Sequence, residues 1–542
     1  MTNGFLAIPQ QTDVLIVGAG PVGLALALDL GWRGISCLIV DQGTGDIAHP
    51  RTGLVSSRTM EFCRRWGLAP AVRACGFPAD FPLNIVFCTS LAGHTLGRAD
   101  YPSMRDLPTP PETPEKKQRC PQSWFDPILR GAVERQPTAT LRHGIRLDSF
   151  RQDAKGVAGE LTKLTGGARH TVRASYMVGC DGASSQVRES LGIAMDGAHA
   201  LSYSINLLLR IPDFASQHDK GLAERYLFAG RQGVWANLTV VDGGETWRLT
   251  VLGSDAKMDL ANFDADAAVR AAIGQDDARF EVTSVVPWRR SQLLAERFRE
   301  GRVLLAGDAA HTMSPTGGMG ANTGVQDAVD LGWKLAAVLR GWGGDALLDS
   351  YTPERRPVAA RAAAFSTGNF RAWTAAKDCA AMLDETSEGE ALRAQVGRTL
   401  ADSTQVEWES LGLQLGYRYE ASPVCVPDGT PPPADEHARY VQTARPGHRA
   451  PHAWLPDGRS TLDLFGQGFV LMASSGANSA ALDAAARRRR VPFSVHRIKD
   501  TEVAALYDAP LVLVRPDGHV AWRGDDHPDP DTLLAIVTGH SD

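Results

Sequence analysis

The sequence lacks several features that would point to particular classes of protein. No apolar run approaches the roughly 20 residues that a helix needs to cross a bilayer, and residues 1–12 lack the basic head and apolar core of a signal peptide. The eight cysteines are scattered without a C-x-x-C pair, so they fit neither a zinc ligand set nor a disulfide framework. These absences predict a cytoplasmic, thiol-reduced protein with no metal site and no membrane span.

A strong excess of one charge is also missing. The 542 residues include 56 Lys+Arg and 62 Asp+Glu, a formal net charge of −6, and 43% of them are hydrophobic. This composition is typical of a globular protein, and without a long basic stripe it gives no electrostatic reason to expect nucleic acid as a partner. Because a single core rarely grows past about 250–300 residues, the length predicts two or three domains.

A strand, a glycine-rich turn, a helix and a second strand follow one another near the N-terminus. Residues 13–17 and 37–40 are short apolar runs, and the segment Gly18-Ala19-Gly20-Pro21-Val22-Gly23 leads from the first run into an apolar helical stretch. Asp41 ends the second run, where a carboxylate accepts hydrogen bonds from ribose hydroxyls. In this order the first glycine allows a tight turn, the second admits a pyrophosphate and the third lets helix and strand pack closely. The pattern predicts a dinucleotide-binding βαβ unit.

Two later apolar runs also end near an acidic residue. Residues 176–179 lead to Asp181-Gly182, followed by an expected helix at 184–191 with Ser184 as its N-cap. Residues 303–306 lead to Gly307-Asp308, followed by a glycine cluster and a long amphipathic helix that ends near Gly341. Since the carboxyl ends of parallel strands meet at one edge of a sheet, we expect these turns to converge with the Gly18 turn on one ligand.

The rest of the chain has a different pattern. Strands expected at 203–210, 233–240, 246–252 and 280–287, with a hairpin at Asp242-Gly243-Gly244, predict an antiparallel sheet that covers the ligand. The proline-rich segment 101–117 is expected to be an exposed loop, and the segment 427–456 is expected to separate the main body from the tail. In the tail we expect strands at 469–472 and 493–498, a helix at 480–488, a hairpin through Pro516-Asp517-Gly518 and a final helix. Arg487 to Arg490 are interpreted as cations at a helix C-terminus.

Four ordered motifs resemble those of the class A flavoprotein monooxygenases, the phenol hydroxylase-like aromatic hydroxylases. They are the Gly18 turn, the segment from His49-Pro50-Arg51 to Glu61, the Asp181-Gly182 turn, and Gly307-Asp308-Ala309-Ala310-His311 with Pro315 and Gly320. The resemblance covers residues 12–357, and the segments 427–431 and 451–455 resemble the thioredoxin-like C-terminal domain of phenol hydroxylase-type enzymes. Ser474, Ser475 and Gly476 replace the thiols of thioredoxin, so the tail is expected to be structural and to support a homodimer.

The resemblance implies an α/β fold with a Rossmann-like FAD-binding domain, an inserted antiparallel-sheet substrate domain and a thioredoxin-like C-terminal domain. The expected boundaries are 1–190 and 296–425 for the FAD-binding domain with its helical region, 191–295 for the substrate domain and 426–542 for the tail. The residues that it assigns to FAD are Gly18, Gly20, Pro21, Val22, Gly23, Asp41, Gln42, Arg51, Gln122, Asp181, Gly182, Gly307, Asp308, Pro315, Gly318, Gly320 and Asn322.

The implied reaction is an FAD-dependent hydroxylation of a small aromatic substrate. In the family, NADPH or NADH reduces FAD, molecular oxygen adds at C4a, and the resulting hydroperoxide hydroxylates an electron-rich ring in a water-free site. Arg51, Tyr226 and Pro315 are the catalytic candidates. Tyr203, Asn206, Trp235 and Arg248 are the candidates for the substrate pocket, and each is also compatible with sheet packing. For His311, a packing or capping role stands beside a catalytic one.

The sequence departs from the simple-phenol and hydroxybiphenyl hydroxylases at two positions. Gly53 stands where they have a histidine, and Arg119 stands where they have an acidic residue just before the Pro-Gln pair that Pro121-Gln122 matches. A larger and already acidic phenol or quinonoid of polyketide type needs less help to ionise, so we favour that substrate class. The alternatives are a catabolic hydroxylase of simple phenols or hydroxyphenyl acids, and a non-catalytic protein that binds flavin or a polyketide. A flavin halogenase and a plain NAD-dependent dehydrogenase are disfavoured, the first by the missing Trp-x-Trp-x-Ile-Pro segment and the second by Gly307-Asp308.

Overall fold

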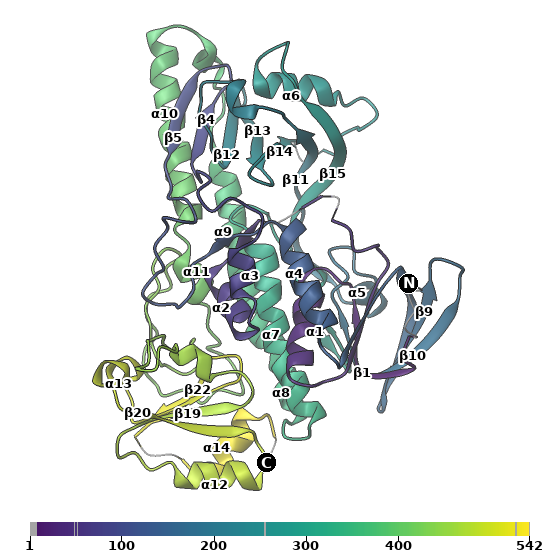
Figure 1. Cartoon of the computed structure of the whole chain (residues 1–542), viewed down its shortest axis with the longest axis vertical. Coiled ribbons are helices and arrows are strands. Elements are labelled where there is room, and N and C mark those ends of the chain that lie inside the picture. Colours follow the sequence, from purple (N-terminus) through teal and green to yellow (C-terminus); the bar gives the residue numbers. More distant parts are fainter. Residues whose placement is uncertain (1–7, 48, 51–52, 254–255, 526–527, 541–542) are drawn as a thin grey trace.

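The fold was analysed in a computed structural model, which describes residues 8–47, 49–50, 53–253, 256–525 and 528–540. Figure 1 shows a central α/β unit, a sheet-rich unit above it and a C-terminal unit below it. The predicted mixture of a Rossmann-like unit, an antiparallel sheet and a C-terminal α/β unit is confirmed.

The central sheet has eight strands, six of them in the order β16-β17-β10-β1-β2-β7, with β8 and β9 attached through β10. Its middle strands are parallel and consist of buried apolar residues, as expected for strands that helices cover on both faces. The predicted strands at 13–17, 37–40, 176–179 and 303–306 all fall in this sheet. The strands are β1 (Gln11–Val17), β2 (Cys37–Asp41), β7 (Ala139–His143), β8 (Ile145–Asp153), β9 (Gly156–Lys163), β10 (Arg169–Gly179), β16 (Arg299–Glu300) and β17 (Val303–Leu305).

Two helices cross closely beside this sheet. In α7 (Met319–Leu339), a Cβ added at Gly324 would lie 2.4 Å from Val22 Cγ2 of α1 (Pro21–Trp32), so only glycine permits this contact. Helix α7 ends at Leu339, with Arg340 as its C-cap. Gly341 follows with φ of 74°, so the helix ends where the sequence predicted. The other helices of this unit are α2 (Ser57–Arg65), α3 (Ala69–Arg73), α4 (Gln122–Glu134), α5 (Gln186–Ser190), α8 (Asp345–Asp349), α9 (Tyr351–Trp373) and α11 (Leu411–Leu415).

The second sheet has eight strands in the order β18-β15-β11-β14-β13-β12-β4-β5. The predicted range 191–295 supplies β11 (Met195–Arg210), β12 (Arg225–Gly230), β13 (Gly233–Val240), β14 (Thr246–Leu252) and β15 (Glu281–Ala295). The sheet is completed from outside that range by β4 (Ile85–Cys88), β5 (Thr95–Ala99) and β18 (His311–Thr312), and α6 (Ala265–Ile273) and α10 (Ser387–Trp408) accompany it (Figure 1).

The strand predicted at 280–287 continues eight residues further, to Ala295. Proline has no N–H for a ladder bond and is usually confined to sheet edges; Pro287 pairs with Ile205 of β11, while β18 on the other side pairs only with Leu293 and Leu294, so Pro287 lies at an edge of the sheet. This extension carries Trp288 and Arg290 into the sheet.

The C-terminal unit has a four-stranded sheet in the order β20-β19-β21-β22, with β19 and β20 parallel and the other pairs antiparallel. The predicted βαβ unit, hairpin and final helix are present, and the sequence missed α13. The elements are β19 (Phe469–Ser474), α12 (Ala480–Arg488), β20 (Phe493–Ile498), α13 (Thr501–Tyr507), β21 (Leu511–Val514), β22 (Val520–Gly524) and α14 (Pro530–Val537). Arg487 pairs with Asp483, and Arg488 and Arg489 pair with Asp531, so these cations close helix ends as predicted.

Two predicted loops are more integrated than expected. Segment 101–117 is exposed only in part, because Glu115 is 3% exposed and binds Arg73 at 2.5 Å. Segment 427–456 is not a simple linker, because its Arg449 is buried against α2. Buried charges that need partners account for both differences.

A buried ion cluster fastens the C-terminal unit to the central one. Glu61 of α2 accepts hydrogen bonds from Arg58 at 2.7 Å and from Arg449 at 2.5 Å, and Arg58 also donates to the Asp517 carbonyl. Burial raises the pKa of the Glu61 carboxyl, but the two arginines lower it to about 2. The carboxylate is therefore charged in the folded protein at any ordinary pH.

We expect Glu61→Gln to lower the free energy of unfolding by about 3–5 kcal/mol at pH 7, because two buried arginines lose their counter-charge. Denaturant titration measures this change. A carboxyl whose pKa is depressed on folding stabilises the fold above its unfolded pKa, so the gap between wild type and variant should close as the pH falls from about 4 towards 2. Asp483→Asn, at the exposed pair with Arg487, is the matched control and should leave stability unchanged. An equal effect of both variants would contradict the assignment.

Candidate functional site

The three predicted turns lie side by side at the carboxyl edge of the central sheet. β10 is the parallel neighbour of both β1 and β17. Cys180 N donates to the Val17 carbonyl at 2.7 Å, and Ala306 N donates to the Gly179 carbonyl at 3.0 Å, so each turn is tied to the next. The expected convergence of three distant segments on one ligand site is thus built into the sheet.

The glycines of the first turn fulfil three different requirements. Gly18 has φ of 106°, and a Cβ there would lie 2.3 Å from the Cys180 carbonyl oxygen; a Cβ at Gly23 would lie 2.0 Å from the Gly18 oxygen. A Cβ at Gly20 would meet nothing within 4 Å. The first two glycines are therefore required by the fold, whereas Gly20 borders open space at the start of α1.

The start of α1 leaves backbone donors available for an anion. Gly20 is its N-cap, Pro21 follows, no side chain caps the helix, and its first turn has no acidic residue. Uncapped N–H groups and the helix dipole suit a pyrophosphate. Val22 faces the predicted Gly307-Asp308 motif, because a Cβ at Gly307 would lie 2.9 Å from Val22 Cγ2.

Asp41 lies at the end of β2, on the other side of the same turn. Its carboxylate accepts hydrogen bonds from Ala19 N at 2.7 Å and from Gly43 N at 2.6 Å. Each oxygen keeps a further lone pair, so the predicted contact with ribose hydroxyls is compatible with this geometry. The neighbouring Gln42 is exposed.

The Asp181 carboxylate folds back onto α5. It accepts the Ser185 hydroxyl at 2.5 Å and Val187 N at 3.0 Å, and burial raises its pKa. The N-cap of α5 is Ser185 and not the predicted Ser184, since Ser185 Oγ accepts from Arg188 N. Gly182, with φ of 82°, has open space where a Cβ would stand, so it can border a ligand.

Gly307-Asp308 is held from behind by a buried charge cluster. Asp308 itself is exposed in a short 3₁₀ turn. Asp327 of α7 accepts Gly307 N at 3.1 Å, His311 Nε2 at 2.6 Å and Arg355 Nε at 2.8 Å, and all three side chains are fully buried. The buried contact with Asp327 is the packing arrangement that the sequence analysis set beside a catalytic role for His311.

The loop from β18 to α7 carries the predicted ring-binding residues. Pro315 is exposed, and Gly318, with φ of 67°, is the N-cap of α7, which has neither a side-chain cap nor an acidic residue in its first turn. A Cβ at Gly320 would meet only Met313, at 3.8 Å. As at α1, the helix presents unshielded N–H groups, which favour negative charge.

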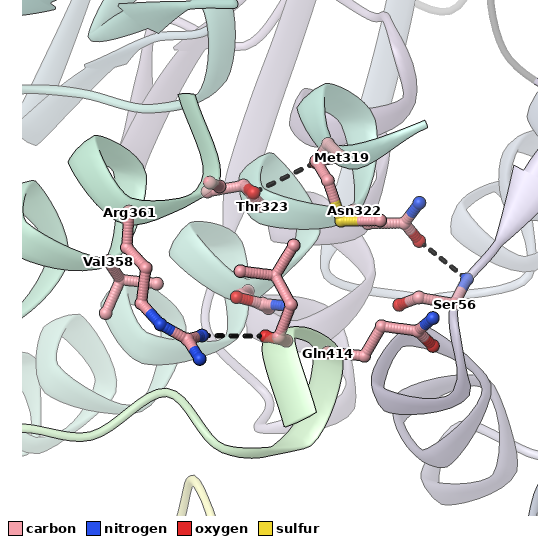
Figure 2. A pocket seen from close by; sticks show the side chains of 10 residues that line it. Ser56, Met319, Asn322, Thr323, Val358, Arg361 and Gln414 are labelled. Carbon is pink, nitrogen blue, oxygen red and sulfur yellow. Dashed lines mark hydrogen bonds between the residues drawn. The ribbon is translucent and has the colours of Figure 1, made fainter. Parts of the chain in front are cut away.

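Asn322 positions this loop and does not offer its side chain to a ligand. Its amide oxygen accepts Ser56 N at 2.8 Å and Thr59 Oγ1 at 2.7 Å, and its amide nitrogen donates to the Leu54 and Gly318 carbonyls. These four hydrogen bonds engage both the oxygen and the nitrogen of the side-chain amide, and the assignment of Asn322 to FAD stays a prediction. Figure 2 shows Asn322 reaching Ser56 beside a small cavity of about 10 Å³, the size of one water, lined also by Thr323, Arg361 and Gln414.

Gln122 begins α4, where Pro121 is the N-cap, and donates from Nε2 to Asp126 at 3.0 Å. Asp126 is 1% exposed, and burial raises its pKa to about 7. Arg51, predicted for both FAD binding and catalysis, lies outside the described residues.

The predicted substrate residues divide between the two faces of the second sheet. Asn206 pairs with Thr250, and Arg248 lies two residues away on the same face, its Nη1 donating to the Pro50 carbonyl at 2.8 Å. Burial, with Arg119 and Arg225 nearby, lowers the pKa of Arg248 to about 10. We call this face, which carries Asn206, Arg225, Arg248 and Arg290, the polar face.

Tyr203 and Tyr226 lie on the opposite face. Tyr203 is an odd-numbered residue of β11, like Ile205 and Leu207 of the apolar core. Tyr226 is fully buried among Phe214 and Trp247 and donates its hydroxyl to the Gly221 carbonyl. Successive residues of a strand point to opposite faces, so Tyr203 and Tyr226 do not share a face with Asn206 and Arg248, and their assignment to the site stays a prediction. Trp235 packs half-buried at a bulge at the hairpin end of the sheet.

Sequence reasoning missed several polar residues next to the Pro315 loop. Arg290 Nη1 donates to Ser314 Oγ at 2.6 Å and to Thr316 Oγ1 at 3.2 Å, the residues on either side of Pro315. From α9, Asn369 Nδ2 lies 3.6 Å from the position of a Cβ at Gly317. Alternation beyond Pro287 could have indicated Arg290; no local pattern could have indicated Asn369.

This arrangement defines a dinucleotide-binding α/β enzyme, in which the second sheet adjoins the carboxyl edge of the central sheet. Residues 11–366 match the FAD binding domain family, and residues 443–539 match the family described as aromatic-ring hydroxylase, C-terminal. The chain belongs to this family of FAD-dependent aromatic hydroxylases and is an FAD-dependent monooxygenase. In the part of the chain that the structure describes, no helix has both the length and the apolar composition needed to cross a membrane.

Several known proteins are similar to this chain over nearly its whole length. Tetracenomycin B2 monooxygenase-dioxygenase of Streptomyces olivaceus is 35% identical and a putative polyketide hydroxylase of Streptomyces halstedii is 33% identical, covering 97% and 95% of this chain and 97% and 94% of their own lengths. The rebeccamycin biosynthetic enzyme RebC, solved with reduced flavin, is 40% identical with a TM-score of 0.91, covering 99% of this chain and 100% of RebC.

We expect Gly20→Ala to lower the FAD content of the purified protein while leaving the stability of the apoprotein nearly unchanged, because the added methyl group meets only the space where pyrophosphate is expected. Visible flavin absorbance per mole of protein and thermal unfolding of the apoprotein measure the two effects. Gly23→Ala is the contrasting variant: its Cβ would collide with the Gly18 oxygen at 2.0 Å, so folding itself should suffer. Full FAD content in Gly20→Ala would contradict the placement.

We expect Asp126→Asn to stabilise the protein at pH 8 and to have little effect near pH 4. A carboxyl whose pKa rises on folding, here to about 7, destabilises the fold as pH rises from its unfolded value through 7. Each pKa unit corresponds to about 1.4 kcal/mol, which sets about 4 kcal/mol as the upper limit of the gain. Denaturant titrations at both pH values measure it, and an equal gain at both would rule out Asp126 as the cause.

Proposed function

We propose that this enzyme hydroxylates an acidic polycyclic phenol or quinonoid of polyketide type, with NADPH or NADH as transient reductant and molecular oxygen as co-substrate. The observation that carries the proposal is the contact between the two positions at which the sequence departs from simple-phenol hydroxylases. A Cβ at Gly53 would lie 2.2 Å from Arg119 Nη1, so the guanidinium occupies the space that a side chain at position 53 would need.

The contact supports the proposal because Gly53 and Arg119 together present a cation, whereas the resemblance implies a histidine and an acidic residue at these two positions in the simple-phenol enzymes. Strands β3 (Leu54–Val55) and β6 (Gln118–Arg119) pair and bring the two positions together, and Arg119 also binds Glu224 at 3.2 Å and the Val240 carbonyl at 3.0 Å. A Cβ at Gly318 would lie 3.1 Å from Leu54, so this pair adjoins the start of α7. A cation favours a substrate that is already ionised but removes no proton, which suits an acidic polyphenol.

The cofactor fits the residues described. The adenosine and pyrophosphate portion of FAD would fit against the open space at Gly20, the uncapped start of α1 and Asp41. The central portion of FAD, between the pyrophosphate and the flavin ring, would be lined by Gly182, Asp308 and Gln122. When bound, FAD accepts hydride from the nicotinamide and activates oxygen. Pro315, Gly318 and Gly320 would border the flavin ring, where the N-terminus of α7 would favour negative charge, and the polar face would exclude bulk water from the substrate. Arg51 stays a catalytic candidate.

The setting proposed for the reaction follows from the reductant. All eight cysteines are free thiols, which suits the cytoplasm, where nicotinamide reductants are kept reduced. A homodimer supported by the C-terminal unit belongs to the same proposal. The relatives named for tetracenomycin B2 and for a polyketide support the substrate class.

The test compares NADPH and NADH oxidation by the holoenzyme with a panel of simple phenols, hydroxyphenyl acids and polycyclic hydroxyquinones. We expect the polycyclic acids to give faster turnover and a higher ratio of hydroxylated product to reductant consumed, because they fill the site and exclude water. Product analysis and hydrogen peroxide assay measure the coupling. Faster, coupled turnover of simple phenols would favour the catabolic alternative, and a holoenzyme that binds the quinones but consumes no reductant would favour the binding-protein alternative.

A further inference from the structure

A buried arginine without a counter-ion lies next to the Pro315 loop. Arg290 is 2% exposed, and no carboxylate of the described residues pairs with it. Its partners are neutral: the hydroxyls of Ser314 and Thr316, the ring of Phe370 at 3.9 Å and the ring of Trp288 at 4.8 Å. Burying an uncompensated charge is unfavourable, and burial lowers the pKa of Arg290 to about 9, which still leaves it cationic at neutral pH.

The other groups without partners around this arginine are donors. Arg290 Nε, Trp288 Nε1 and Asn369 Nδ2 are buried N–H groups that find no acceptor among the described residues. Arg248 Nε, further along the polar face, is in the same condition. Ser204, which pairs with Trp288 across β11 and β15, adds a buried hydroxyl with no partner. Among the buried side-chain atoms without a partner on these elements, in the part of the chain that the structure describes, none is a carboxylate or amide oxygen.

Such a set is satisfied by a ligand that brings acceptors. Leaving several buried donors unpaired costs about 1–3 kcal/mol each, so the fold tolerates them only where something else completes them. Arg225, on the same polar face, shows the contrasting solution, since Glu407 neutralises it at 3.1 Å. Arg290 has no such residue, and its counter-charge must come from outside the chain.

We propose that Arg290, together with Trp288 and Asn369, forms an oxyanion site beside the Pro315 loop that binds an ionised hydroxyl or carboxylate of the aromatic substrate. The inference rests on the proposed function and deepens it. The chain ionises its substrate by stabilising the anion, and the phenolic proton passes to solvent on binding. Stabilisation of the anion by Arg290 would take the place of a general base, which Gly53 and Arg119 do not provide.

The test uses the FAD-loaded enzyme and 1,2-dihydroxyanthraquinone, whose colour changes on ionisation, with 1,2-dimethoxyanthraquinone as the analogue that cannot ionise. At a pH below the pKa of the free dye, the wild type should bind it with the spectrum of the anion and release one proton per dye. Binding as the neutral species, with no proton release, would overturn the proposal without any variant having to fold.

Variants identify the residue responsible. Arg290→Gln should weaken binding of the hydroxylated dye by about 10- to 100-fold, as expected for a charge-assisted hydrogen bond, and leave the methylated analogue nearly unaffected. Arg290→Lys should keep the anion spectrum, and Asn369→Asp, which replaces a donor by an anion of the same size, should lose it. Arg356→Gln in α9, which removes a half-buried arginine bound to Asp196 and to the Ala295 carbonyl at the far end of β15, is the matched control and should behave as wild type.

The outcomes separate this inference from the proposed function. Equal weakening of both dyes in Arg290→Gln would show that Arg290 only holds the Pro315 loop, and the inference fails even if the variant still hydroxylates polyphenols. Ionised binding that depends on Arg290 in an enzyme that hydroxylates none of the panel would uphold the oxyanion site while the proposed function fails.

Discussion

Parallel pairing of β1 with β10, and of β10 with β17, is the constraint on which the functional edge depends. Because parallel strands end on the same side, pairing in this order brings the Gly18, Asp181 and Gly307 turns into contact, although nearly three hundred residues separate the first from the last. The glycines then permit distances that no side chain would allow, between Gly18 and Cys180 and between Gly324 and Val22. Displacing any of these strands would move one turn away from the others.

Behind that edge, buried charge replaces ordinary apolar packing. Asp327 connects the Gly307 turn to Arg355, and Arg355 donates to Tyr419 at 3.3 Å. A second cluster joins α7, α9 and the C-terminal unit, with Lys334 bound to Glu354 at 2.5 Å and Glu354 to Arg515 at 2.6 Å. Removing one member of such a cluster is more damaging than removing a surface pair, because the remaining charges stay buried without compensation.

Local patterns allowed much of the fold to be predicted from the sequence, and the limits of those patterns explain the errors. The apolar runs and the glycine turn are local, so β1, β2 and the FAD edge were predictable, as was the arrangement of the C-terminal unit. The face on which a strand residue lies depends on register, which local pattern does not fix, so the sequence could not show that Tyr203 and Tyr226 lie opposite to Asn206 and Arg248. Glu61 and Arg449 are 388 residues apart, and Arg290 and Asn369 come from different elements; only the folded chain shows that each set belongs together.

The cluster around Arg515 also has a consequence for the order of events on the ribosome. Lys334, Glu354 and Asp330 lie in the helices that support the flavin edge, yet Arg515, which binds both carboxylates and also Asp517 of its own hairpin, stands near the end of the chain. A nascent chain that has emerged only past α9 still lacks this buried partner of Glu354 and Asp330. We therefore expect the cofactor-binding half to reach its final packing only once translation has delivered the last domain, so that premature termination would disturb the central unit as well as shorten the protein.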